Sequence, residues 1–174
     1  EIEALSQYEF DSEGIPLKDF GGNLGRQYEP IVPVYYAQRY LDCYRKTGET
    51  AYRENLERMV RWLRQQMVPL GDARNVERTI YSHYHYLPYT RAPWICGMNC
   101  GRAAELFLEL HKSFARKEDL LAATSLIRGL LIPMRDGGIL LETEGGGYLF
   151  EEFGTLAPAL WSLNGHCSVL LSFH

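Results

Sequence analysis

A chain of 174 residues is long enough to bury one hydrophobic core and too short for two comfortable domains. Apolar residues make up 46% of the sequence and charged residues 23%, which is the balance of an ordinary globular protein. The net charge of −4, with no block of Lys or Arg, argues against a nucleic-acid partner. No apolar run approaches the roughly 20 residues that a membrane span requires.

The two ends of the sequence indicate a piece of a longer polypeptide. The chain opens at Glu1 with no apolar signal segment, and it stops within the apolar run VLLSFH. We therefore expect the native chain to continue beyond residue 174, and the sequence leaves the compartment unknown.

Residues 1–30 are rich in Gly and Pro and show no sustained period, so we expect an irregular lead-in with at most short strands. From Val34 apolar residues follow a helical period, and Gly48 and Thr50 suit the end of one helix and the start of the next. The second helix is expected to run to about Met67. The two helices form a predicted αα-hairpin, whose apolar stripes consist of Tyr36, Tyr40, Cys43, Tyr44 and then Leu56, Met59, Val60, Leu63.

The middle of the chain changes period and then returns to helices. Residues 80–87 alternate with a period of two that ends at Pro88, which predicts a strand or hairpin arm rich in aromatic rings. Apolar stripes over residues 103–114 and 120–130 predict a second helix pair. The Gly-rich segment at 138–150 predicts a short hairpin, and a third helix is expected to begin near Pro158 and to run off the end.

The helical units repeat along the chain. Tyr44, His111 and His174 occupy equivalent places near the end of the first helix of each unit, at nearly equal spacings. Long periods that each hold a helical hairpin favour helix pairs arranged around an axis. We therefore expect a mainly α fold, an (α/α) barrel or toroid of antiparallel helix pairs with short β-hairpins over the cleft, incomplete in this chain. A plain helical bundle with long loops is the weaker alternative.

The cysteines do not follow the spacing of a structural zinc site. Cys96 and Cys100 are four residues apart and could share a helix face. They would form a metal site with His166 and Cys167 only if the fold brought the two segments together. We expect buried free thiols and no metal or other cofactor.

Several segments in order resemble the C-terminal catalytic domain of D-glucuronyl C5-epimerases. They are YYAQRYLDCYRKTGETAY, TRAPWICGMNCGRAAELF, GGILLETEGGGYLFEEFG and the LNG that opens the last helix. The resemblance runs from about Ile31 to the end, so it implies an epimerase-like (α/α) domain over residues 31–174 after the lead-in. It also implies a cleft for an anionic, glucuronate-containing polysaccharide of the heparosan or heparan type. A homodimer is a possible assembly.

The resemblance implies an isomerase that removes the C5 proton of a glucuronosyl residue and returns a proton from the opposite face. Such a site needs a base, an acid and groups that neutralise enolate-like charge, but no redox cofactor. Members of the resembled family supply the proton carriers chiefly as tyrosines. This chain has other residues at the matching or framing positions, namely Ile95, Phe150, Phe153 and Ser168, while it keeps Trp94, Met98, Gly101, Glu151, Glu152, Asn164 and Gly165.

Candidate site residues follow from these matches and substitutions. His83 and Tyr84 on the aromatic strand are candidates to replace the missing tyrosines, because an imidazole titrates near neutral pH. Adjacent carboxylates point opposite ways in an extended chain, so one of Glu151 and Glu152 is expected to face the cleft and the other to fix the turn. The candidates are catalytic His83, Tyr84, Glu151 and Glu152, and substrate-binding Arg91, Trp94, Arg102, Asn164 and His166.

Other functions remain open at this stage. The missing tyrosines favour a non-catalytic module that binds an anionic glycan or serves in assembly. A lyase would begin with the same C5 proton abstraction. A glycosidase would need two acids about 5–10 Å apart across the cleft, and Glu105, Glu109, Glu142 and Glu144 offer no obvious pair.

Overall fold

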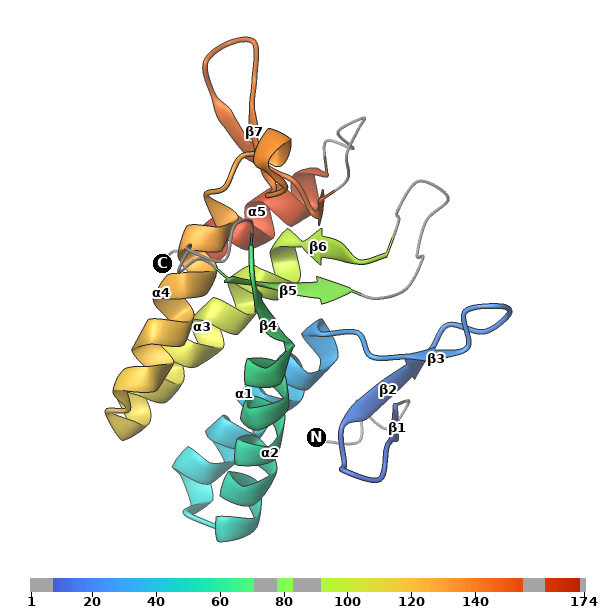
Figure 1. Cartoon of the computed structure of the whole chain (residues 1–174). Helices are drawn as coiled ribbons and strands as arrows, with labels where there is room; N and C mark the ends of the chain where they lie inside the picture. Colours follow the sequence, from blue (N-terminus) through green and yellow to red (C-terminus); the bar gives the residue numbers. More distant parts are fainter. Residues whose placement is uncertain (1–7, 71–77, 83–91, 155–161, 173–174) are drawn as a thin grey trace.

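The computed structural model describes residues 8–70, 78–82, 92–154 and 162–172, and it is mainly helical (Figure 1). Five α-helices lie in these residues: α1 (Ile31–Thr47), α2 (Thr50–Gln66), α3 (Gly97–Phe114), α4 (Lys117–Leu130) and α5 (Leu163–Leu171). Consecutive helices form the pairs α1–α2 and α3–α4, as the apolar periods predict. Helix α3 also packs against α1 and α5, so it lies at the centre of the helical layer.

The first helices of the two pairs end in the same way. Gly48 follows α1 with a left-handed φ of 72°, and its N–H donates to the carbonyl of Tyr44 at 2.8 Å. Ala115 follows α3 with φ 53°, and its N–H donates to the carbonyl of His111 at 2.8 Å. The predicted equivalence of Tyr44 and His111 is therefore confirmed, while His174 lies outside the described residues.

The helices bury a continuous apolar core. The stripe of α2 is buried at the predicted positions, and the same holds for most of α3 and α4. Close-packed side chains of this kind provide most of the stability of amphipathic helices. Side chains that are essentially inaccessible include Leu56, Leu63, Leu106, Phe107, Leu110 and Leu126.

Short antiparallel sheets lie at one end of the helix pairs and beside α1 (Figure 1). A four-stranded sheet has the order β4 (Met67–Pro69), β5 (Arg78–Ser82), β6 (Trp94–Cys96) and β9 (Phe153–Gly154). The predicted hairpin is formed by β7 (Leu140–Glu142) and β8 (Tyr148–Phe150), and a short 3-10 helix, η2 (Met134–Asp136), precedes it. In the N-terminal segment, β1 (Glu9–Phe10), β2 (Pro16–Asp19) and β3 (Arg26–Gln27) form a three-stranded sheet.

The last helix is shorter than the sequence predicts. Pro158 lies outside the described residues, but Ser162 is already extended and α5 begins at Leu163. Serine favours the position before a helix because its hydroxyl can accept a hydrogen bond from an unpaired backbone N–H of the first turn. Helix α5 ends at Leu171, and the N–H of the next residue, Ser172, donates to the carbonyl of Val169 at 3.0 Å.

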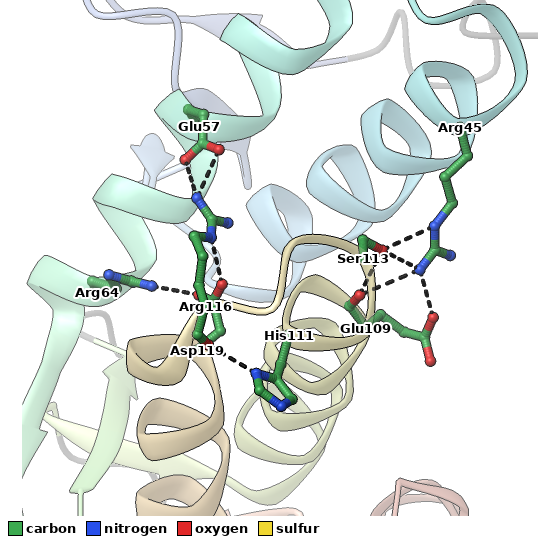
Figure 2. Close-up of polar contacts among 8 residues, drawn as sticks. All are labelled: Arg45, Glu57, Arg64, Glu109, His111, Ser113, Arg116 and Asp119. Carbon is green, nitrogen blue, oxygen red and sulfur yellow. Dashed lines mark hydrogen bonds and ion pairs between the residues drawn. The ribbon is translucent and has the colours of Figure 1, made fainter.

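A polar network around the buried carboxylate of Asp119 joins α2 to the start of α4 (Figure 2). The carboxylate of Asp119 is fully buried; it accepts hydrogen bonds from Arg64 and, at 2.7 Å, from Nε of Arg116. Arg116 also donates to both carboxylate oxygens of Glu57 at 2.8 and 2.9 Å. Burial alone would lower the pKa of Arg116, but the carboxylates of Glu57 and Asp119 outweigh burial and raise it. This network fixes the position of one helix pair against the other.

A second polar contact joins the ends of α1 and α3 (Figure 2). Arg45 donates to the carboxylate of Glu109 at 2.9 Å and to the hydroxyl of Ser113. Lys112 and Arg45 together lower the pKa of Glu109, because both donate hydrogen bonds to its ionised form. The second contact lies near the loops that close the two helix pairs, whereas Arg64 of the first network lies at the end of α2 that leads into β4.

Candidate functional site

One face of the four-stranded sheet gathers the matched tryptophan and its neighbours. Directly paired residues of antiparallel strands project to the same face, so Ser82 lies beside Trp94 and Phe153 lies beside Cys96. The rings of Trp94 and Phe153 are tilted by 39° with centroids 5.1 Å apart. Trp94 is only 4% exposed, so it supports Phe153 from beneath rather than presenting its own ring to solvent.

The N-terminal segment closes this cluster. Phe20, in the turn after β2, packs against the buried pair Trp94 and Cys96, together with Met98 and Phe153. The sequence pattern gives no signal for this contact, because it joins segments more than seventy residues apart.

Glu151 and Glu152 point in different directions, as an extended segment requires. Glu151 is 0% exposed, and its backbone N–H donates to the carbonyl of Ile139 at 2.9 Å. Glu152 is half-buried, and its carbonyl accepts the N–H of Gly97 at the start of α3 at 2.9 Å. Of the two, Glu152 is the carboxylate with access to solvent.

The start of α5 holds the Glu152 side chain in place. Its Oε2 accepts hydrogen bonds from Oγ of Ser162 at 2.8 Å and from Nδ2 of Asn164 at 3.2 Å. A Cβ at Gly165 would lie 2.4 Å from Cβ of Glu152, so only glycine permits this approach of helix and loop. Sequence matching selects Asn164 and Gly165, whereas Ser162 is signalled only by its preference for helix starts.

His166 lies one turn into α5 and is half-buried. Its ring stacks on Phe150 with centroids 5.9 Å apart, and its Nδ1 lies 3.0 Å from the backbone N–H of Phe150. A backbone N–H can only donate, so Nδ1 accepts and the neutral ring carries its proton on Nε2. His166 is thus oriented as a donor through Nε2.

The remaining candidates are Arg102 and three residues outside the described part of the chain. Arg102 on α3 is half-buried and pairs with Glu105 one turn later at 2.9 Å, so part of its charge is matched locally. His83, Tyr84 and Arg91 lie outside the described residues. The structure therefore brings Glu152 together with Ser162 and Asn164 at the start of α5, and His166 together with Phe150. It brings Trp94 together with Phe20 and Phe153.

The described cysteines are free thiols. Cys96 lies on β6 and Cys100 in the first turn of α3, so they do not share a helix face as the spacing allowed. Burial raises the pKa of both thiols, and the hydroxyl of Thr79 lies 3.3 Å from the sulfur of Cys100. Cys167 is exposed, and the described residues contain no group of three or more His, Cys, Asp or Glu side chains that could hold a metal ion.

Among the helices in the described part of the chain, none combines the length and apolarity needed to cross a membrane.

Comparison with known proteins identifies the family and gives one solved structure with a similar fold. A solved structure, the glycoside hydrolase family 76 (mannosidase) Bt3792 from Bacteroides thetaiotaomicron VPI-5482, is similar with a TM-score of 0.56 and 14% sequence identity. The match covers 80% of this chain but 33% of that one, so this chain spans about a third of the mannosidase and the likeness concerns the fold alone. No curated protein matches the sequence. The family described as D-glucuronyl C5-epimerase C-terminus matches residues 73–174, more than half of the sequence, and the chain therefore belongs to this family.

Proposed function

We propose that the chain acts on a glucuronate-containing polysaccharide of the heparosan or heparan type as a uronyl C5-epimerase. Family membership supports this proposal. The observation that carries it is the carboxylate of Glu152, which Ser162 and Asn164 hold in place at the start of α5. A carboxylate with access to solvent and the half-buried ring of Phe153 suit the hydroxyl-bearing and apolar sides of a sugar ring.

The reaction needs no oxidant or reductant. A base takes the C5 hydrogen as a proton, and the electron pair of the C–H bond moves into the adjacent carboxylate, which becomes an enediolate. An acid then returns a proton to C5 from the opposite face, and the electron pair re-forms a C–H bond with inverted configuration. Donors near the carboxylate lower the barrier because they stabilise the dianionic intermediate.

The proposed roles follow from the local geometry. Glu152 is half-buried and oriented by two donors, so it is a base or an orienting group, whereas Glu151 fixes the turn from its buried position. His166 offers its Nε2 proton to the substrate. We propose His83 and Tyr84 as proton carriers, and Arg91 and Arg102 as partners of the substrate carboxylate. We further propose an (α/α) toroid that is incomplete in this chain as the architecture, and a homodimer as the assembly.

The test is exchange at C5. The protein is incubated in D₂O with a desulfated glucuronate polysaccharide, and deuterium at C5 is followed by NMR. We expect incorporation in the wild type and a loss of at least about tenfold in Glu152→Gln, His83→Ala or Tyr84→Phe, in the range of a general acid–base contribution. Glu142→Gln is the matched control, because Glu142 is exposed on β7 and should not alter the rate.

One feature of the candidate site favours a second function. Phe150 and Phe153 frame the two glutamates but carry no hydroxyl, and Phe150 is buried against His166. A module that binds an anionic glycan without changing it would need only the aromatic and polar contacts. Binding with no deuterium incorporation in the wild type would reject the epimerase and support this alternative.

A further inference from the structure

We propose that Lys18, on the N-terminal β2 strand, is a carboxylate-binding residue that gives the site its preference for a uronate. The inference rests on the proposed glycan site, and it extends that site to a segment that the family match over residues 73–174 does not include. Its starting point is Phe20, whose packing on Trp94 and Cys96 brings the β2–β3 hairpin to the site.

The ammonium of Lys18 is held at a defined place. Its Nζ lies 4.7 Å from the centroid of the Phe20 ring and 2.7 Å from a carboxylate oxygen of Glu29. The ring in turn packs on the Trp94 cluster, so one aromatic side chain separates the cation from the buried tryptophan. An amine held by a π-face and a carboxylate loses less rotational freedom when it binds a further group.

The ammonium has capacity for one more partner. It carries three N–H donors, of which Glu29 takes one and the π-face of Phe20 occupies another direction. The Lys18 side chain remains 36% exposed, while Glu29 is 19% exposed and therefore faces the protein more than solvent. The remaining donor suits an anionic oxygen, and in a chain of net charge −4 a local cation is needed to attract a polyanion.

The hairpin that carries Lys18 is locally fixed. The N–H of Phe20 donates to the carbonyl of Gly25 at 2.9 Å, and the carboxylate of Asp19 accepts the N–H of Gly21 at 2.8 Å. Strand β2 pairs with β3 at Lys18, opposite Gln27. The cation is therefore presented by a closed turn and a paired strand rather than by a free segment.

The experiment compares two substitutions with opposite expected signs. Binding of a glucuronate polysaccharide is titrated calorimetrically at low and moderate salt, beside a carboxyl-reduced form of the same polymer. Lys18→Met should weaken binding of the charged polymer about two- to fivefold, the range of one partly exposed charged contact, and the loss should shrink as salt rises. Glu29→Gln should strengthen binding, because it frees the ammonium. Neither change should alter binding of the carboxyl-reduced polymer.

Lys112→Met is the matched control, because Lys112 also pairs with a glutamate, at 2.8 Å, but lies at the far end of α3. Thermal unfolding of each variant verifies that the fold is intact. A purely structural Lys18–Glu29 pair would make both substitutions act in the same direction, and that result overturns the inference. So does a loss in Lys18→Met that is equal for the charged and the reduced polymer.

The outcome also separates this inference from the proposed function. Deuterium exchange at C5 that persists with normal binding in Lys18→Met refutes the role of Lys18 and leaves the epimerase standing. Wild-type binding without exchange refutes the epimerase, while the opposite signs at Lys18 and Glu29 still support the uronate contact. A wild-type protein that binds no glucuronate polymer overturns both.

Discussion

Replacing Asp119 with alanine removes the carboxylate on which two arginines converge (Figure 2). Loss of one partner of a buried ion pair costs about 3–5 kcal/mol, because the remaining charge is left uncompensated. Here the side chains of Arg64 and Arg116 are 35% and 23% exposed, and Arg116 keeps its contacts with Glu57. After discounting for this solvent screening, we expect the free energy of unfolding to fall by about 2–3 kcal/mol.

The assay is urea and thermal unfolding followed by circular dichroism of the helices. A loss of this size in a chain of this length lowers the melting temperature by about 5–10 °C. Glu118→Ala is the matched control, since Glu118 is the exposed neighbour in the same first turn of α4. It removes a similar favourable interaction with the helix N-terminus, worth about 0.3–1 kcal/mol, but no buried pair.

The physical cause can be tested by adding Arg64→Met to the Asp119→Ala variant. If an uncompensated guanidinium is what destabilises the single variant, the double variant should be the more stable of the two. The reasoning is refuted if Asp119→Ala and Glu118→Ala agree within about 0.5 kcal/mol, which is the uncertainty of additivity.

Two further predictions concern backbone positions. Gly165→Ala should lower the free energy of unfolding by about 1–3 kcal/mol, because the new methyl group would overlap Glu152. The control is Gly145→Ala, where the space is open, and both variants are measured by chemical denaturation. A Gly165→Ala variant that is more stable than Gly145→Ala would contradict the prediction. Ala115→Gly should raise the free energy of unfolding by about 0.5–1 kcal/mol, since alanine has a steric penalty at φ 53° that glycine avoids. An unchanged or lower urea midpoint would show that the left-handed cap is not strained.

The sequence by itself determined the helical part of this protein. Helix periodicity is a local property, since the residues of one stripe lie three or four positions apart, and the stripes of α2 to α4 are visible in the sequence for that reason. In α1 the helix is predicted correctly, but Tyr36 is the one member of the predicted stripe that is fully buried, and Val34, Ala37 and Leu41 are buried beside it. The ends of helices are local too, and Gly48 was predicted as a cap. Ala115 adopts the same left-handed conformation but gives no such signal, because alanine rarely does so.

The sequence also carried part of the candidate site, through motifs rather than geometry. It selected Glu152, Asn164 and His166, which the fold brings to one wall at the start of α5. It could not decide which of Glu151 and Glu152 is accessible. Alternation says only that adjacent side chains point apart, and which side is the interior depends on the segments that cover it.

Only the tertiary structure decided the remaining contacts of the site. Trp94 is buried because Phe20 and Phe153, far from it in sequence, pack around it. The tautomer of His166 on α5 depends on the backbone amide of Phe150 in strand β8. Such contacts leave no periodic trace, because they join segments whose separation along the chain carries no information about their distance in space. Lys18 and Phe20 are two residues apart and project to the same side of the chain for a local reason. Their place beside the matched tryptophan, in contrast, arises only when the chain is folded.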